Sequence, residues 1–226
     1  MKTAVLLSGC GVYDGAEIHE SVFTLLALTQ NQLDYICVAP DIDQNHVINH
    51  TNGEEINDTR NVFVESARIA RGEILSLSEL NKDDISSLVI PGGFGAAKNL
   101  SNWAFEGTDG CVLQEVKDLI TYCVENKKPI VALCISPTLI AKSLQGKSYI
   151  PKLTLGSVKE NSEYNIEEMH GAISSIGAST SNISIKEICV DEDLKIISAP
   201  CYMMNGNIND VYNNIKMAID KLANIL

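Results

Sequence analysis

Cys134 follows a short apolar run and stands where a nucleophile would be expected. Residues 129–133 predict a buried strand, and Pro137 is well placed in the first turn of a helix. A sharp strand-to-helix turn needs small residues two positions before and after its tip, and here these are Ala132 and Ser136. The amides of the helix start would favour the thiolate and lower the pKa of the thiol. A packing cysteine that merely ends a strand fits the pattern equally well.

The sequence PGGFG follows another predicted strand, residues 87–90, and suggests a second part of the same site. Its glycines let the backbone approach a ligand and aim N–H groups inward, so the amides of Gly93 and Ile135 could form an oxyanion hole. Gly92 and Phe94 are candidate substrate-binding residues beside them. A phosphate cradle near Lys98 is an alternative, although the spacing of a P-loop is missing. A simple tight turn is another.

Two acidic residues, Glu17 and Glu20, lie one helical turn apart after the first predicted strand. Carboxylates at a helix start often do no more than interact with the helix dipole. If Glu20 instead points into the cleft, burial beside a thiolate would raise its pKa and make it a proton carrier.

Other polar residues could reach the same cleft from neighbouring loops. The four histidines show no metal-ligand spacing with one another or with a cysteine, so no metal site is expected. The remaining candidates for lining the cleft are Cys10, His19, His50, Arg60 and Asn99. For Cys10, simple packing as a free cysteine is the competing interpretation.

Strands and helices alternate along the chain. Apolar runs predict strands at 3–7, 35–39, 87–90 and 129–133, and a strand pair at 183–190 and 194–198. Helical periodicity predicts helices at 17–30, 61–71, 111–125, 137–144 and 207–226. On the first helix, one side carries Ile18, Val22, Leu25, Leu26 and Thr29. Residues 40–60 are polar and look like an insert, and 153–182 is ambiguous and partly helical.

This alternation predicts an α/β fold with a mostly parallel sheet, doubly wound and covered by helices on both faces. In such sheets, sites form beyond the carboxyl ends of the strands. Cys10, Gly93 and Cys134 all follow predicted strands, so we expect them at one edge of the sheet.

The overall composition excludes several classes of partner. A net charge of −12 repels phosphate backbones and anionic lipid, so neither nucleic acid nor a membrane is expected as a partner. No apolar run is long enough for a transmembrane helix. The seven cysteines are odd in number and form no CxxC, which predicts a reduced, cytoplasmic protein without a disulfide framework.

Five segments resemble a known family, the ElbB-type glyoxalases of the class I glutamine amidotransferase-like superfamily, which are associated by name with isoprenoid biosynthesis. They are LSGCGVYDGAEIHE (7–20), NDTRNVFVESARIARGEI (57–74), VIPGGFGAAKNLSN (89–102), CISP (134–137) and VDEDLKII (190–197). The resemblance implies one flavodoxin-like domain over residues 1–226, a homodimer, and no cofactor. It assigns the nucleophile to Cys134, the acid to Glu20 and the oxyanion glycine to Gly93.

The chain also departs from the superfamily. Superfamily peptidases carry a histidine after the cysteine, where this chain has Ile135. Glutamine amidotransferases carry a late HxE motif, whereas here His170 is followed by Gly171 and Ala172. No complete Cys-His-acid triad can be assembled, which disfavours peptidase and amidotransferase activity.

Two functional hypotheses follow from these residues. The first is a glutathione-independent glyoxalase in which Cys134 attacks glyoxal, or methylglyoxal, to form a hemithioacetal. Glu20 would move a proton between the two carbons, and water would release glycolate or lactate. The second is a non-catalytic redox-sensing or regulatory protein in which Cys134 is oxidised to a sulfinic acid.

Overall fold

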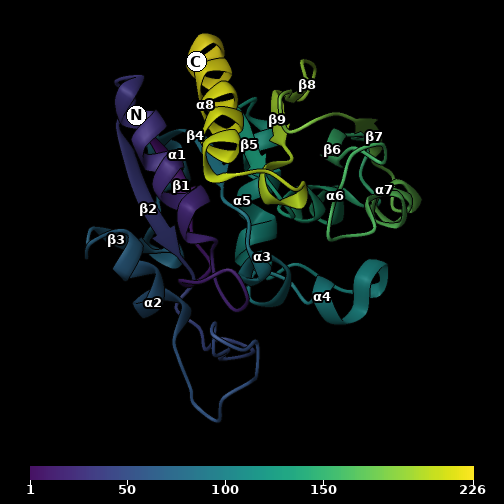
Figure 1. Cartoon of the computed structure of the whole chain (residues 1–226). Helices are drawn as coiled ribbons and strands as arrows, with labels where there is room; N and C mark the ends of the chain where they lie inside the picture. Colours follow the sequence, from purple (N-terminus) through teal and green to yellow (C-terminus); the bar gives the residue numbers. More distant parts are fainter.

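A seven-stranded sheet with the order β3-β2-β1-β4-β5-β9-β8 forms the centre of the molecule (Figure 1). The structure is a computed structural model and describes residues 1–226. All neighbouring strands run parallel except β8, which is antiparallel to β9. The strands are β1 (Lys2–Leu6), β2 (Tyr35–Ala39), β3 (Ile74–Ser76), β4 (Ile85–Ile90), β5 (Ile130–Leu133), β8 (Cys189–Asp191) and β9 (Ile196–Ala199). Every residue of β5 and β9 is buried, as expected for strands covered on both faces.

Helices cover both faces of this sheet, and each face has its own apolar core. One core joins the sheet to α5 (Gln114–Glu125), α6 (Pro137–Leu144) and α7 (Ile166–Ser175). The other joins it to α1 (Ile18–Gln30), α2 (Val62–Ile69) and α8 (Ile208–Ile225). In Figure 1, α1 and α8 lie side by side across the sheet, and the two helices pack against each other. The predicted flavodoxin-like α/β sandwich is confirmed.

The sequence missed several short elements. These are β3, the short helices α3 (Phe94–Lys98) and α4 (Trp103–Glu106), and a separate two-stranded parallel sheet of β6 (Lys152–Gly156) and β7 (Ser179–Asn182). The strand pair expected near the C-terminus is present as β8 and β9, but β8 begins only at Cys189. No helix is long and apolar enough to span a bilayer.

Part of the predicted apolar side of α1 faces solvent. Ile18, Val22 and Leu26 are 44%, 46% and 43% exposed. The buried residues of this helix are mainly small or polar, and they include Glu20 and Thr24. The helix thus turns a carboxylate toward the sheet and leaves an apolar stripe on its outer face.

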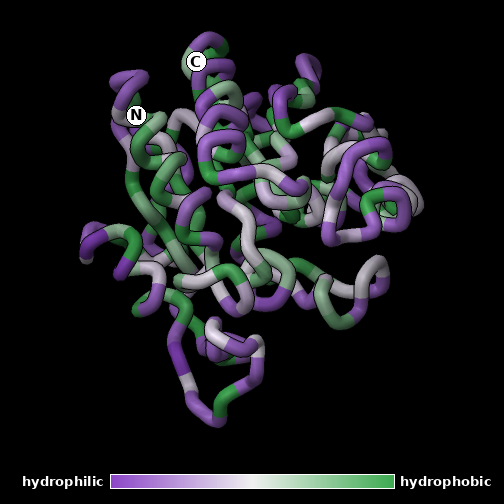
Figure 2. The backbone as a smooth tube through the Cα atoms, viewed as in Figure 1, coloured by the Kyte–Doolittle hydropathy of each residue, from purple (hydrophilic) through white to green (hydrophobic).

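Between β2 and α2, residues 40–61 form a loop that projects from the end of the sheet (Figure 1) and is mostly hydrophilic (Figure 2). Its only strand-like pairings are two isolated bridges, Asp43 with Asn61 and Ile48 with Glu55. The loop is tied to the domain because the Ile48 amide donates to the buried Asp14 carboxylate at 2.7 Å. Its interpretation as an insert stays a prediction.

Candidate active site

Cys134 lies on the sharp turn between β5 and α6. Its backbone has a φ of 57°, in the left-handed region that non-glycine residues rarely adopt. Two contacts hold the turn: the Cys134 amide donates to the Ala199 carbonyl of β9 at 2.9 Å, and the Ser136 hydroxyl donates to the Pro91 carbonyl at 2.8 Å. Ala132 and Ser136 are both fully buried, so larger side chains would not fit at either position.

Glu20 lies directly beside this cysteine in the interior. One carboxylate oxygen accepts the Gly92 amide at 2.8 Å, and the other accepts the Tyr202 amide at 3.3 Å. The carboxyl group also hydrogen-bonds the Cys134 thiol. Burial, reinforced by the charge of Glu17, raises the pKa of Glu20 from 4.5 to about 8. Glu20 therefore carries its proton at neutral pH, which suits a group that gives and takes one proton.

The expectation of a lowered thiol pKa at Cys134 is wrong for this environment. Burial and the negative charge of Glu20 raise the pKa of the thiol well above its ordinary value, while hydrogen bonds from the Gly93 and Ile135 amides act against that rise. Desolvation outweighs the start of the helix because the side chain is buried and its nearest ionisable neighbour is an acid. Cys134 and Glu20 form a coupled pair, and removal of the first proton leaves one proton shared between them.

Two backbone amides, those of Gly93 and Ile135, point at the sulfur. Neither donates to another group of the chain. Gly93 has a φ of 95°, and a side chain there would collide with the backbone of Glu17. Gly92 leaves room for the reacting pair, since a Cβ there would lie 2.9 Å from the Cys134 sulfur and 2.8 Å from a Glu20 oxygen. Both glycines are thus required by close packing around the site.

A cavity of about 290 Å³ opens above Cys134. Eleven of its thirteen lining residues are hydrophobic, and the lining contains neither lysine nor arginine. The full lining is Val12, Glu17, Gly93, Phe94, Ala97, Trp103, Ala104, Cys134, Ile135, Tyr164, Met169, Tyr202 and Met203. Such a cavity suits a small uncharged molecule.

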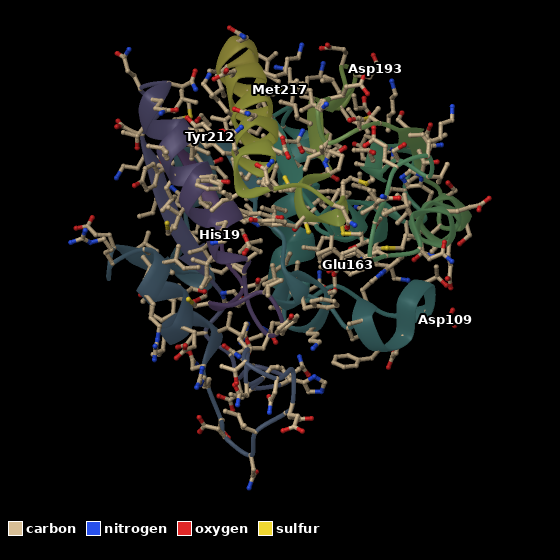
Figure 3. The ribbon with its side chains drawn as sticks, viewed as in Figure 1. His19, Asp109, Glu163, Asp193, Tyr212 and Met217 are labelled. Atoms are coloured by element: carbon tan, nitrogen blue, oxygen red, sulfur yellow. The ribbon has the colours of Figure 1, made fainter.

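A more polar outer chamber adjoins this cavity and shares Val12, Glu17, Tyr164 and Tyr202 with it. Its lining includes His19 and Glu163, which Figure 3 labels, and again no lysine or arginine. The His19 ring nitrogen Nδ1 lies 2.8 Å from the Tyr202 hydroxyl. His19 thus lies at the entrance and not beside the sulfur.

Four other candidates from the sequence, Cys10, His50, Arg60 and Asn99, line neither chamber. Arg60 pairs with Asp58 and Glu65. The amide nitrogen of Asn99 donates to the carbonyls of Ser8 and Asp14, so this side chain holds a loop together.

The ring of His50 accepts the Tyr13 amide at 3.2 Å and lies on the projecting loop. Burial raises the pKa of the Cys10 thiol, and the charge of Glu65 on α2 raises it further, so Cys10 lies on the side of α2. Within the loop after β1, Gly9 binds the Ser66 hydroxyl of α2 and Tyr13 binds His50 of the projecting loop, whereas Val12 and Glu17 are the residues that reach the chambers.

The structure does not support the alternative of a phosphate-binding turn at Gly92 and Gly93, because Lys98 does not reach it. The Lys98 ammonium donates to the Tyr13 carbonyl at 2.9 Å and lies over the Phe94 ring, 5.3 Å from its centroid. It is absent from the lining of both chambers. The Phe94 amide is also occupied, since it donates to the Val12 carbonyl at 2.7 Å. No cluster of three or more His, Cys, Asp or Glu side chains is arranged to hold a metal ion.

Two neighbours of the site were not anticipated. Glu17 caps α1 through a hydrogen bond from the Glu20 amide at 2.7 Å and also lines both chambers. Cys201 is fully buried next to Cys134 and Glu20. It follows the predicted strand 194–198 after two intervening residues, Ala199 and Pro200, which is a weaker form of the signal that identified Cys134.

Comparison with known proteins places the chain among relatives that match nearly all of it. No family model matches. The ES1 protein homolog of Rattus norvegicus is 37% identical over 99% of this chain and 84% of its own length. The human glutamine amidotransferase-like class 1 domain-containing protein 3 is also 37% identical, over 99% of this chain and 83% of its own length.

Solved structures also match nearly the whole length of this chain. An isoprenoid biosynthesis protein with an amidotransferase-like domain from Ehrlichia chaffeensis is 33% identical, with a TM-score of 0.89 over the full length of both chains. Drosophila melanogaster DJ-1beta has 18% identity and a TM-score of 0.57, covering 98% of this chain and 90% of its own, and shares the fold alone.

The names of the relatives also correct the expected localisation. The rat, human and Danio rerio relatives are all named as mitochondrial proteins, which contradicts a cytoplasmic assignment. Free cysteines indicate only a reducing environment and do not identify the compartment. Since two of these relatives exceed one-third identity over nearly the whole sequence, the chain belongs to the ES1 family of proteins with a class 1 glutamine amidotransferase-like domain.

Proposed function

We propose that this protein is a cofactor-independent glyoxalase that converts glyoxal, and with it methylglyoxal, to glycolate and lactate. The observation that carries the proposal is the pairing of Cys134 with a buried Glu20 of raised pKa, at the base of a small apolar cavity. Two free amides, from Gly93 and Ile135, face the sulfur. Isomerisation of a dicarbonyl requires a nucleophile, a proton carrier and an oxyanion hole. We assign these roles to Cys134, to Glu20 and to the two amides.

The reaction begins when the sulfur of Cys134 forms a bond to one aldehyde carbon. The C=O electron pair moves to oxygen, where the Gly93 and Ile135 amides stabilise the charge until a proton arrives. Glu20 then removes the proton from the hemithioacetal carbon to give an enediol and returns it to the neighbouring carbon. The product of that transfer is a thioester, which water hydrolyses to the hydroxy acid and the free thiol.

The charge of the cavity sets the substrate class. Neither chamber has a lysine or arginine in its lining, and the outer one contains Glu163 and Asp210 in addition to Glu17. A carboxylate on the substrate would meet negative charge without a cation to pair with it. Neutral dicarbonyls are therefore the expected substrates, and glyoxylate is expected to be a poor one.

The test is glycolate formation from glyoxal by purified protein. Cys134→Ser is expected to abolish it, whereas Cys111→Ser, which changes an exposed thiol, is expected to retain the wild-type rate. Comparing kcat/KM for glyoxal, methylglyoxal and glycated amines then defines the substrate. Retention of the wild-type rate by Cys134→Ser would exclude the cysteine mechanism.

A homodimer, implied by the family resemblance, is also proposed. The exposed apolar stripe of Ile18, Val22 and Leu26 on α1 supports a contact with a second copy, because solvent-exposed apolar stripes on helices often mark interfaces. Light scattering on wild type and on Val22→Glu tests this. A monomeric wild-type protein, or a dimer unaffected by the substitution, would argue against this surface.

A further inference from the structure

Cys201 is a second buried thiol that the proposed reaction does not use. It is the first residue of η4 (Cys201–Met203), shortly after β9 ends at Ala199. Because β5 and β9 are parallel neighbours with Leu133 opposite Ala199, Cys134 and Cys201 leave the same edge of the sheet. Both have left-handed backbone angles, with φ of 57° and 48°.

The side chains of the two cysteines share one buried environment. Burial raises the pKa of the Cys201 thiol well above its ordinary value, and the negative charges of Glu20 and Cys134 raise it further, so these two groups lie near its sulfur. Cys201 is 0% exposed and Cys134 is 7% exposed. The turns that carry them are also in direct contact, because the Cys134 amide donates to the Ala199 carbonyl, two residues before Cys201, at 2.9 Å.

Access to the two thiols differs. Cys134 lines the inner cavity, whereas Cys201 lines neither chamber. A small oxidant that enters the cavity therefore meets Cys134 first. Cys201, which the oxidant does not reach, can then react only with the oxidised sulfur of Cys134. In redox-active cysteine pairs the first thiol is the one that the oxidant attacks, and the second is called the resolving cysteine.

We propose that Cys201 is a resolving thiol, which forms a disulfide with Cys134 after a hydroperoxide has oxidised Cys134. In the first step the Cys134 sulfur attacks the peroxide and the O–O bond breaks; one oxygen stays on the sulfur as a sulfenic acid, and the other takes the proton that the thiol loses and leaves as water or an alcohol. In the second step the Cys201 sulfur attacks the sulfenic sulfur; the S–O bond breaks and water leaves. Glu20, next to both sulfurs, takes the proton of the Cys201 thiol and passes it to the departing hydroxyl.

This reaction has two consequences for the site. Oxidation of Cys134 stops at a disulfide that a dithiol can reduce and does not continue to the sulfinic acid expected of an isolated cysteine. While the disulfide persists, the sulfur cannot add to an aldehyde. The inference shares Cys134 with the proposed function but does not depend on glyoxalase activity, because it is measured without substrate.

The experiment is titration of the reduced protein with hydrogen peroxide, followed by intact mass measurement and non-reducing peptide mapping. Wild type is expected to lose two hydrogens and to yield a peptide linking Cys134 to Cys201. Cys201→Ala is expected to gain two oxygens on Cys134 over the same peroxide range. Cys189→Ala, which removes a buried thiol on β8, is the matched control and should behave as wild type.

A dithiol reductant should then restore iodoacetamide labelling of Cys134 in wild type and not in Cys201→Ala. The peptide map of wild type needs no variant, so a folding defect in Cys201→Ala leaves the test intact. Cys134 found as sulfinic acid in wild type, or linked to any other cysteine, would overturn the proposal. Loss of glyoxalase activity alone would not affect it.

Discussion

Replacement of Glu20 by glutamine separates the ionisation of this residue from its packing. The pKa of Glu20 is raised from 4.5 to about 8, so between these values the unfolded chain ionises while the folded protein keeps its proton. Folding stability therefore falls as pH rises through this window, by about 5 kcal/mol in total at about 1.4 kcal/mol per pH unit. Below pH 4.5 both states are protonated, and the contribution vanishes.

Glutamine has the same shape as glutamate and no charge, so the folding stability of Glu20→Gln should not fall between pH 4.5 and pH 8. Its amide nitrogen, however, would face either the Gly92 or the Tyr202 amide, two donors that now bind the carboxyl oxygens. Leaving one buried donor unpaired costs about 1–3 kcal/mol. The variant is thus expected to be less stable than wild type at pH 5 and at least equally stable at pH 8.

Urea unfolding at pH 5, 6, 7 and 8 measures both curves. Glu115→Gln, an exposed position on α5, controls for the general effect of removing one acid and should follow wild type. Parallel curves for wild type and Glu20→Gln would refute the reasoning, since they would mean that Glu20 has the same ionisation in the folded and unfolded states. Turnover of Glu20→Gln should fall at every pH, because glutamine carries no transferable proton.

Three further predictions concern the same site. Gly92→Ala should reduce kcat for glyoxal by at least about a hundredfold, because its methyl group would collide with Cys134 and displace the nucleophile; steady-state kinetics measures this, and a near-normal rate would contradict the packing argument. Asn214→Ala should destabilise the fold by about 1–3 kcal/mol in urea unfolding, since Asn214 accepts the Cys201 amide at 2.9 Å and donates to the Glu187 carbonyl at 2.8 Å; an unchanged midpoint would exclude this. In wild type, kcat/KM for glyoxal should rise with pH and reach half its maximum near pH 8, as the coupled pair loses its first proton; a rate independent of pH from 6 to 9 would exclude that ionisation.

Much of the fold was predictable because buried parallel strands form short apolar runs, and β1, β4 and β5 are of this kind. The orientation of α1 was not predictable from hydropathy. Its apolar stripe faces solvent, while Glu20 faces the sheet because two amides and a thiol are available there as partners. The helix still packs on the core through Ala27 and Leu28, so the buried carboxyl group of Glu20 lies on the same face as these apolar residues.

The site itself was predictable only in part, and the reason is geometric. Cys134 and Gly93 follow strands, and strand ends have fixed places at one edge of a sheet. Residues on long connections have no such constraint, which is why Arg60 and His50 were expected in the cleft and lie outside it. The thiol pKa was missed for a different reason: a helix start is visible in the sequence, but the burial that opposes it is not.

The single proton that the Cys134–Glu20 pair keeps after its first ionisation also explains why Ile135 is compatible with catalysis. Hydrolysis of an amide needs a proton delivered to a departing nitrogen and a base for the incoming water, which is the work of the histidine that other members carry. Addition of a thiol to an aldehyde has no leaving group: the proton lost by sulfur ends on the new hydroxyl, and the next step moves one proton between adjacent carbons. A single carboxyl group with a pKa of about 8, hydrogen-bonded to the sulfur, can serve each of these transfers in turn. An apolar residue at position 135 then contributes its amide to the oxyanion hole while its side chain lines the cavity. Isoleucine at position 135 is therefore compatible with addition of a thiol to an aldehyde, which is the chemistry proposed for this site.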